Sequence, residues 1–272
     1  MQIAPIKELV PYIKHYLFLE SESDFNLKKL RLFSDGNTGM VFTFTASLYI
    51  NNSETKIFKY PDSFLYGQIS AFKDLFLTKN TKIIIVVFQP YGINHLLGIP
   101  AIELRDEITS ITELLGKNGE ELYERLSEES KLDLRLNILN NFFIEQVIKR
   151  QSVNKNFIPS LLSFILKNKG QVTSTQLENY SGYTERHIQR IFKESIGLNP
   201  KKYGNIVMLH NFLNLLKSRT IDKNLTNLSY EAGYADQAHL IKEFKKYTGI
   251  TPTEYLNNTS RLAVNFFEIK LE

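Results

Sequence analysis

The sequence contains no cysteine, and this absence excludes several kinds of chemistry. Disulfide bonds, thiolate nucleophiles and cysteine-bound zinc all need that side chain. The five histidines form no pair at metal-binding spacing, and the glycines form no phosphate-binding loop. We therefore expect no metal, no cofactor, no catalytic residue and no enzymatic activity.

Long apolar runs are also absent. The most apolar run, Ile83 to Phe88, is far shorter than the about 20 residues that cross a bilayer. The first ten residues lack the apolar core of a signal peptide. We expect a cytoplasmic protein that does not enter the membrane.

Charge is present in ordinary amounts but is unevenly distributed. Residues 151–272 contain 16 Lys and Arg against 10 Asp and Glu, a net charge of +6, whereas residues 1–150 have a net charge of −2. A mild excess by itself is typical of a solvated surface. A basic half beside a slightly acidic one also fits a phosphate-binding module joined to a domain that does not bind nucleic acid.

The first half has the spacing of short strands. Met40 to Ala46 alternates large apolar residues with smaller or polar ones, the period of a half-buried strand. Four more short runs follow: Ile57 to Tyr60, Phe64 to Tyr66, Asp74 to Thr78 and Ile83 to Phe88. Turn-forming residues occupy 35–37 and 51–53. The pattern predicts an antiparallel barrel or sandwich.

After Pro90 the apolar spacing becomes helical. We expect helices at Ile93 to Leu97, Ile108 to Leu115, Glu120 to Leu126 and Leu132 to Ile148. The last helix carries a long apolar stripe, made of Leu132, Leu136, Leu139, Phe143 and Val147. Two interpretations remain open: the stripe packs inside its own domain, or it forms the seam of a homodimer.

The last third of the chain repeats one pattern. Five pairs lie 52 residues apart: Phe192 and Phe244, Lys193 and Lys245, Gly197 and Gly249, Pro200 and Pro252, and Tyr203 and Tyr255. Gly182 and Gly233, 51 residues apart, suit the turn between two helices. The repeat indicates one helix-turn-helix unit used twice.

The second helix of each unit has a distinctive outward face. In the first unit, Ser174 or Thr175 can cap the first helix and Thr184 the second. The inward set is Leu177, Tyr180, Ile188, Ile191 and Phe192. The outward set consists of hydrogen-bond donors for guanine, adenine or phosphate: Arg186, Gln189, Arg190 and Lys193.

The second unit follows the same plan with a less polar face. Thr226 opens its first helix and Asp236 caps its second. Leu240 and Phe244 point inward. The outward set is Gln237, Ala238, Ile241, Lys242 and Lys245. Ala238 and Ile241 suit contacts with thymine methyl groups, and the alternative that Ile241 packs on a neighbouring helix stays open.

A single helix, Pro200 to Leu216, is expected between the units. Its seventeen residues span roughly 25 Å, which with the flanking turns suits recognition helices about 34 Å apart, one turn of B-DNA. Nearby cations would add salt-dependent affinity: Lys201, Lys202, Lys217, Arg219 and Lys223.

Residues from about Phe157 to Leu256 resemble the DNA-binding domain of the AraC/XylS family of bacterial transcription regulators. The resemblance rests on Gly182 to Lys193, Gly233 to Lys246 and Gly249 to Tyr255. It implies a sequence-specific regulator that binds double-stranded DNA and acts with RNA polymerase. The base-facing positions it implies are Arg186, Gln189, Arg190, Gln237, Ile241 and Lys242, to which the spacing adds Ala238. The candidate phosphate contacts are His187, Lys193, Lys201, Lys202, His239, Lys245 and Lys246.

Three residues depart from the family pattern. Glu178 and Ser229 stand where the family favours a small buried alanine, and we expect Glu178 to loosen the packing of the first unit. Lys242 replaces the usual arginine and weakens any bidentate contact with guanine there.

The first half also resembles the sensor domains joined to such regulators. The matching stretches are Phe88 to Gly92 and Leu97 to Pro100. The resemblance implies either a pocket for a small-molecule effector or a module for dimerisation or partner docking. Seven aromatic residues line a pocket or fill a core: Phe42, Phe44, Tyr49, Phe64, Tyr66, Phe72 and Phe76.

Taken together, the sequence predicts an α+β protein of two domains. Residues 1–150 form a β-rich sensor or dimerisation domain that ends in helices, and residues 151–156 form a linker. Residues 157–258 form an all-α double helix-turn-helix domain. Residues 259–272 form a tail that looks like an added strand.

Overall fold

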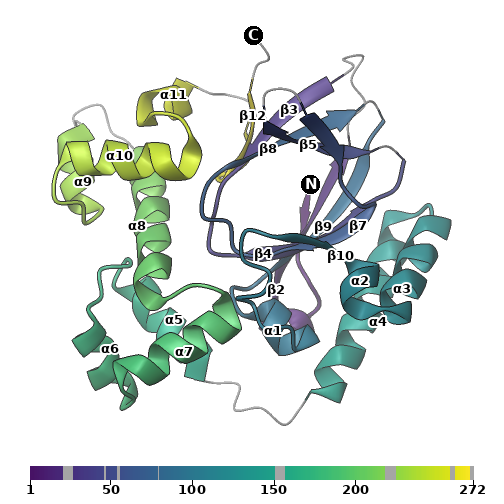
Figure 1. Ribbon diagram of the computed structural model, residues 1–272, viewed down its shortest axis with the longest axis horizontal. Coiled ribbons are helices and arrows are strands. Elements are labelled where there is room, and N and C mark those ends of the chain that lie inside the picture. Colours follow the sequence, from purple (N-terminus) through teal and green to yellow (C-terminus); the bar gives the residue numbers. More distant parts are fainter. Residues whose placement is uncertain are drawn as a thin grey trace.

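The computed structural model describes residues 1–20, 27–45, 47–53, 56–78, 80–150, 157–217, 225–257 and 261–269. A β-sandwich with helices on one side stands next to an all-helical module, which confirms the predicted α+β architecture (Figure 1). The expected linker at 151–156 and the cations Arg219 and Lys223 lie outside the described residues.

Two antiparallel sheets of six strands form the sandwich. The first sheet has the order β1 (Gln2–Ile3), β2 (Ile13–Glu20), β9 (Lys82–Phe88), β4 (Thr38–Thr43), β7 (Ser63–Tyr66) and β10 (Ile108–Ser110). The second has the order β11 (Arg261–Ala263), β12 (Phe266–Ile269), β3 (Leu27–Leu32), β8 (Lys73–Thr78), β5 (Leu48–Ser53) and β6 (Lys56–Lys59). The turn expected at 51–53 is wrong, because these residues continue β5.

Strand β4 explains why simple alternation misleads in this sheet. We expected a half-buried strand, yet all six of its residues are buried. Met40 and Phe42 pack into a core beneath the helices, while Val41 packs into the core between the sheets. Both faces of the strand are therefore covered, and the side chains alternate between two cores rather than between core and water.

Helices cover the outer face of the first sheet. They are α1 (Gly92–Leu97), α2 (Ile111–Leu115), α3 (Lys117–Glu128) and α4 (Leu132–Lys149), with a short 3₁₀ helix at Lys7–Leu9. The helix expected from Ile108 to Leu115 is only half right, since its first three residues pair with β7 as β10.

The apolar stripe of α4 packs inside its own chain. Leu139 and Phe143 are fully buried, Leu136 is buried, and the rings of Phe143 and Phe88 meet edge to face at 5.5 Å. Of the two interpretations left open for Leu132 to Ile148, the structure shows packing inside the same domain for Leu136, Leu139 and Phe143, so these side chains are not available for a homodimer seam.

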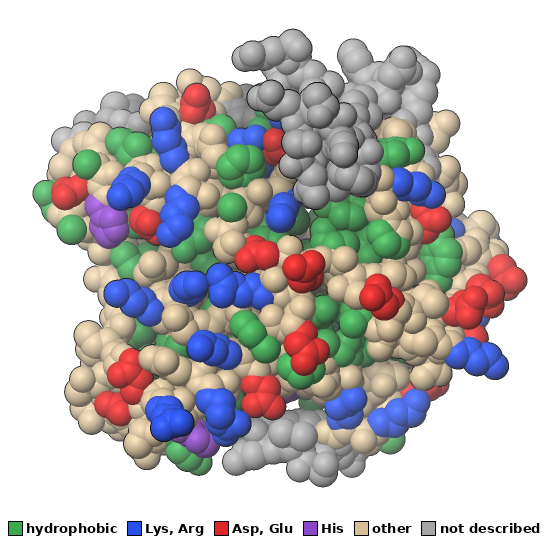
Figure 2. Space-filling model, viewed as in Figure 1, with side chains coloured by type: hydrophobic (Ala, Val, Ile, Leu, Met, Phe, Trp, Pro, Cys, Tyr) green, Lys and Arg blue, Asp and Glu red, His purple; other side chains and the backbone are tan. Residues whose placement is uncertain are grey.

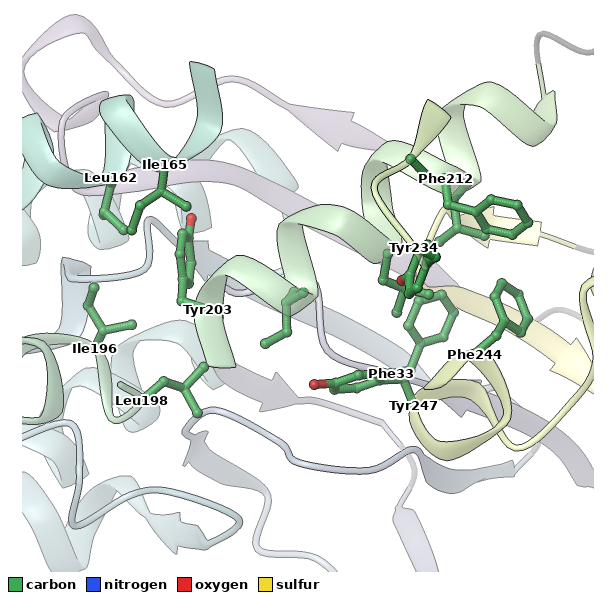
Figure 3. Close-up of a cluster of buried hydrophobic side chains, with 14 of the residues drawn as sticks. Phe33, Leu162, Ile165, Ile196, Leu198, Tyr203, Phe212, Tyr234, Phe244 and Tyr247 are labelled. Atoms are coloured by element: carbon green, nitrogen blue, oxygen red, sulfur yellow. The ribbon is translucent and has the colours of Figure 1, made fainter. Parts of the chain in front are cut away.

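The C-terminal module is built around one long helix. Its elements are α5 (Phe157–Lys167), α6 (Ser174–Ser181), α7 (Glu185–Ile196), α8 (Pro200–Lys217), α9 (Leu225–Glu231), α10 (Gln237–Thr248) and α11 (Pro252–Asn257). Helix α8 has 18 residues and spans about 27 Å. Figure 3 shows buried side chains gathered at both of its ends, near Tyr203 at one end and near Phe212 at the other.

The tail does not stand apart from the two halves. Strand β12 pairs with β3, and Asn265 exchanges two hydrogen bonds with the backbone of Phe33. Phe266 faces the core between the sheets, whereas Phe267 enters the core of the helical module together with Phe33. The segment expected as a separate tail at 259–272 thus supplies part of the N-terminal sandwich and connects it with the helical module.

Candidate DNA-binding surface

The helical module contains two helix-turn-helix units, α6 with α7 and α9 with α10. Helix α6 begins with a capping box in which Thr173 accepts from the backbone N–H of Gln176, and Gln176 accepts from the backbone N–H of Thr173. The cap expected at Ser174 or Thr175 is therefore one or two residues too late. Gly182 ends the helix at a φ of 74°, as the turn requires.

In each unit, a hydrogen bond at an equivalent position joins the two helices. In the first unit the Ser174 hydroxyl donates to Glu185 at 2.7 Å. In the second the Thr226 hydroxyl donates to Gln237 at 2.7 Å. Each pair lies 52 residues from its counterpart and joins the first turn of one helix to the first residue of the recognition helix. An equivalent contact therefore holds the angle between the two helices in both units.

The N-terminus of α7 is capped by Glu178, the residue that we expected to loosen the packing of the first unit. Thr184 occupies the N-cap position, but its hydroxyl makes no capping hydrogen bond. The Glu178 carboxylate instead accepts from the backbone N–H of Glu185 at 2.7 Å. The expectation that Glu178 loosens the unit is wrong, because a carboxylate at a helix N-terminus is favourable.

The second unit satisfies its polar groups differently. Asp236 caps α10 by accepting from the backbone N–H of His239 at 2.7 Å, as expected. Ser229 is fully buried, and its hydroxyl donates to the carbonyl of Thr226 at 2.7 Å. A serine is tolerated at this position because its hydroxyl is paired within its own helix.

The outward face of α7 is exposed and rich in donors. Arg186 and Arg190 are exposed, and Gln189 is half-buried. Gln189 donates to Glu185 at 2.8 Å, and Arg190 lies 3.4 Å from Glu194. Both contacts are between surface groups, so DNA can replace them at small cost.

The outward face of α10 mixes polar and apolar groups. Ala238 and Lys242 are exposed, and Gln237 and Ile241 are half-buried. Leu240 and Phe244 are fully buried on the opposite side. The structure thus presents all seven candidate base-facing residues on the side of each helix that faces away from the core.

The two histidines of the repeat lie in different surroundings. The ring of His187 is stacked on Tyr183 at 4.6 Å, and that of Phe157 lies 6.1 Å away. His239 is exposed and meets Tyr234 edge to face at 5.5 Å. His187 is therefore half-buried among aromatic rings, whereas His239 is exposed.

The remaining candidate phosphate contacts are all exposed: Lys193, Lys201, Lys202, Lys245 and Lys246. Figure 2 shows Lys and Arg side chains on this side of the molecule over α7, near the start of α8 and over α10. Tyr180, expected in the buried face of α6, is wrong: its side chain is 48% exposed and stacks on Phe164.

The sandwich contacts the C-terminal end of both recognition helices. The backbone N–H of Ala101 donates to the carbonyl of Glu194 at 2.7 Å, and a Cβ at Gly197 would collide with Ala101. Arg31 donates to the carbonyl of Thr248 at 3.3 Å, and a Cβ at Gly249 would collide with Arg31. These contacts leave the N-terminal ends of α7 and α10 pointing outward.

Arg31 is the main residue that sequence reasoning missed. It forms two hydrogen bonds with Asp74, at 2.6 and 2.7 Å, and its guanidinium lies 3.9 Å from the centre of the Phe72 ring. A cation here also suits the negative end of α10. No local pattern marks Arg31, because its partners come from distant parts of the chain.

A largely apolar cavity of ≈ 80 Å³ lies between the two sheets. Leu17 and Val87 line it from the first sheet, Leu77 from the second and Phe266 from the tail. The Tyr60 hydroxyl at its wall is buried and has no hydrogen-bond partner in the part of the chain that the structure describes, and burial raises the pKa of Tyr60. Of the seven aromatic residues considered from the sequence, Phe64 and Tyr66 line this cavity, whereas Phe42 lies in the core beneath the helices.

Comparison with known proteins identifies the two halves separately. Residues 1–110 match a domain of unknown function (DUF6597), and residues 177–258 match a helix-turn-helix domain. A 117-residue stretch is 26% identical to an uncharacterized HTH-type transcriptional regulator of Haemophilus influenzae, covering 43% of this chain and 39% of that protein. A 109-residue stretch is 28% identical to the probable transcription factor PqrA of Proteus vulgaris, covering 40% of this chain and 86% of PqrA. Residues 177–258 therefore form a helix-turn-helix domain of the AraC type.

Solved structures with a related chain path include ToxT of Vibrio cholerae O395. That structure covers 89% of this chain and 96% of its own, at 14% identity and a TM-score of 0.44. The chain spans only 39% of the length of the Haemophilus relative and 12% of several Staphylococcus aureus relatives. The relatives named here are transcriptional regulators.

Neither a metal-binding cluster nor a membrane-spanning helix occurs among the described residues. No group of three or more metal-ligating side chains is found among them. No helix in the described part of the chain is long and apolar enough to cross a membrane.

Proposed function

We propose that this chain is a sequence-specific transcription regulator of the AraC family that places α7 and α10 in successive major grooves of double-stranded DNA. One observation carries the proposal: two units of the same design stand at opposite ends of α8, and their outward faces hold exposed donors. A rigid helix of about 27 Å with its flanking turns suits a separation near one turn of B-DNA. At a promoter, the partner of such a regulator is RNA polymerase.

The two units divide the reading of bases. Arg186 and Arg190 on α7 suit guanine, and Gln189 suits adenine. On α10, Ala238 and Ile241 suit thymine methyl groups, while Gln237 and Lys242 supply donors. The exposed lysines Lys193, Lys201, Lys202, Lys245 and Lys246, with the two repeat histidines, His187 and His239, contact phosphates and set the salt dependence.

The test begins by selecting bound fragments from randomised DNA with the full chain. We expect a split site with two half-sites about one helical turn apart. In a second selection, Arg186→Ala should relax the preference at one position and weaken binding by on the order of 1–3 kcal/mol. A matched variant, Lys167→Ala at the end of α5, should keep the preference. Selection of no sequence by the wild type would overturn the proposal.

We further propose that a small apolar molecule with one hydrogen-bonding group binds between the two sheets and acts as an effector. The apolar lining and the unpaired, buried Tyr60 hydroxyl support this. The cavity volume is several times the about 10–15 Å³ that one water needs. A ligand in contact with Phe266 would act on the helical module through the adjacent Phe267, which lies in the core of that module.

Melting of the full chain in the presence of small aromatic and aliphatic compounds tests this effector. A ligand that binds only the folded state raises the melting temperature. We expect the rise to shrink in Tyr60→Phe and to persist in Tyr183→Phe, which changes an exposed tyrosine far from the cavity. An equal rise in both variants would place the ligand elsewhere. If no compound binds, the first half serves instead as a docking or oligomerisation module.

A further inference from the structure

A basic groove of ≈ 320 Å³ lies where the sandwich meets the helical module, and we call it the central groove. Four cations line it from three parts of the chain: Lys201 and Lys202 at the start of α8, Lys246 on α10, and Arg105 in the turn that follows α1. Arg105 therefore brings a charge from the N-terminal half to a surface otherwise made by the helical module.

The central groove lies between the two recognition helices. At one end, Lys201 also lines a neighbouring hollow together with Gln189 and Glu185 of α7. At the other end, Lys246 stands one helical turn after Lys242, a candidate base-facing residue of α10. Figure 2 shows Lys and Arg side chains on the face between α7 and α10.

The cations of the groove are only partly neutralised by carboxylates. Asp106 lies 3.6 Å from the Arg105 Nε, beyond hydrogen-bond reach, and its oxygens accept from the backbone and hydroxyl of Ser70 instead. The buried Nε of Arg105 has no hydrogen-bond partner among the described residues. Glu243 lies 3.3 Å from Lys246. Lys201 and Lys202 have no ion-pair partner in the described part of the chain, so the groove keeps a surplus of positive charge.

The start of α8 adds to this surplus. Pro200 is its first residue, and the Asn199 side chain accepts from the backbone N–H of Lys202 at 2.8 Å. The N-terminal end of a helix carries a partial positive charge that favours anions. A phosphate in the groove would meet this helix end, two lysines and the guanidinium of Arg105.

We propose that the central groove binds a backbone phosphate of the DNA between the two half-sites, and that Arg105 makes the N-terminal half part of the DNA contact. The inference rests on the proposed function. When α7 and α10 enter successive major grooves, the minor groove and its flanking phosphates face the protein between them. A contact with phosphate carries no sequence information, so Arg105 acts on affinity alone.

The experiment measures the affinity of the full chain for its selected site and for a scrambled duplex across a series of salt concentrations. We expect Arg105→Gln to weaken binding to both duplexes alike, by roughly three- to tenfold, and to make the slope of log affinity against log salt shallower by about one. Arg105→Lys should restore most of the slope because it keeps the charge. Arg125→Gln removes the same charge from an exposed position on α3 and should leave the slope near the wild-type value.

The outcomes are distinguishable. If the wild type binds no DNA, the proposed function fails and the inference with it. If the wild type binds and Arg105→Gln matches Arg125→Gln, the inference alone is overturned. If inorganic pyrophosphate raises the melting temperature of the wild type but not of Arg105→Gln, while the DNA slopes are equal, the groove takes a free phosphate and the proposal for DNA is also overturned.

Discussion

Single side chains around the start of α7 fix the orientation of that helix. Glu178 accepts from the first backbone N–H of α7, and Glu185 holds both Ser174 and Gln189. These carboxylates orient the helix without joining the row proposed to face the bases. Arg186 thereby projects from a fixed N-terminal turn.

Removing the cap should cost stability in a measurable way. We expect Glu178→Ala to lower the free energy of unfolding by about 1 kcal/mol, because the N–H of Glu185 loses its acceptor. Chemical denaturation measures this change. Asn179→Ala, an exposed neighbour on the same helix, serves as the control. Equal stability of the two variants would show that the hydrogen bond from Glu185 contributes nothing.

His210 links α8 to the sandwich and makes stability depend on pH. Its Nε2 lies 3.0 Å from the carbonyl oxygen of Ser34. Burial lowers the pKa of His210 below its ordinary value of 6.5, and the nearby Asp35 carboxylate opposes this shift only in part. The unfolded chain therefore takes up the proton first as pH falls. The stability of the neutral form is present above pH 6.5 and is lost as pH falls from there through the folded pKa.

Melting temperatures measured from about pH 7.5 down to about pH 5.5 check this sign. The wild type should lose stability faster than His210→Gln, which cannot be protonated. Burial also lowers the pKa of His15, but that group is common to both proteins and cancels in the difference. Parallel curves would contradict the prediction.

At the residue scale, the sequence predicts the roles that depend on near neighbours and misses those that depend on distant residues. Asp236 and Gly182 were predicted correctly, because a cap and a turn depend on neighbours within a few residues. Glu178 was misjudged, because its partner lies across the turn on the next helix. Arg31 and Arg105 were not found, since the residues around them come from other parts of the fold.

At the scale of elements, α4 shows that apolar spacing predicts a buried face but not the partner that covers it. The stripe of Leu136, Leu139 and Phe143 was found correctly, but its spacing is the same whether the partner is a sheet or a second chain. Similarly, residues 108–115 have helical spacing, yet β7 offers an unpaired edge and takes the first three as a strand. The apolar face of an element can be predicted more safely than the partner that covers it.

Two substitutions in α4 distinguish core from interface. Leu139→Asp should unfold the first half, because it places a carboxylate where the side chain is fully buried. Ile148→Asp, at a position that is 62% exposed on the same helix, should leave the fold intact. Circular dichroism and size-exclusion chromatography report fold and size. A folded monomer of Leu139→Asp beside a dimeric wild type would restore the seam interpretation.

At the scale of the whole molecule, the first half contributes side chains to the core of the helical module. Phe33 of the first half is fully buried among α8, α11 and the tail, with its ring 6.5 Å from that of Tyr255 and 6.3 Å from that of Phe267. Sequence patterns predicted two separate domains, because composition and period change near residue 150. The strand pairing and the ring contacts that join the halves leave no trace in either signal.

Shared packing predicts a single unfolding transition. Calorimetry of the full chain should show one cooperative peak. Phe33→Ala should lower the free energy of unfolding by about 3–5 kcal/mol and split that peak in two, because the joint between the halves is lost. Phe18→Ala, at a partly buried position beneath the helices, should lower the temperature of the peak without splitting it. Two peaks in the wild type would contradict the shared packing.

The pairing of Leu32 with Phe266 has a consequence for synthesis on the ribosome. Strand β3 emerges long before the segment that completes its sheet. Until then the nascent sandwich carries an open edge, a template for pairing with other chains. Such distant pairing is slow to form, so aggregation competes with folding until β12 arrives. Shortened versions of the chain that stop after α11 lack β12, so the edge of β3 stays open and prone to aggregation.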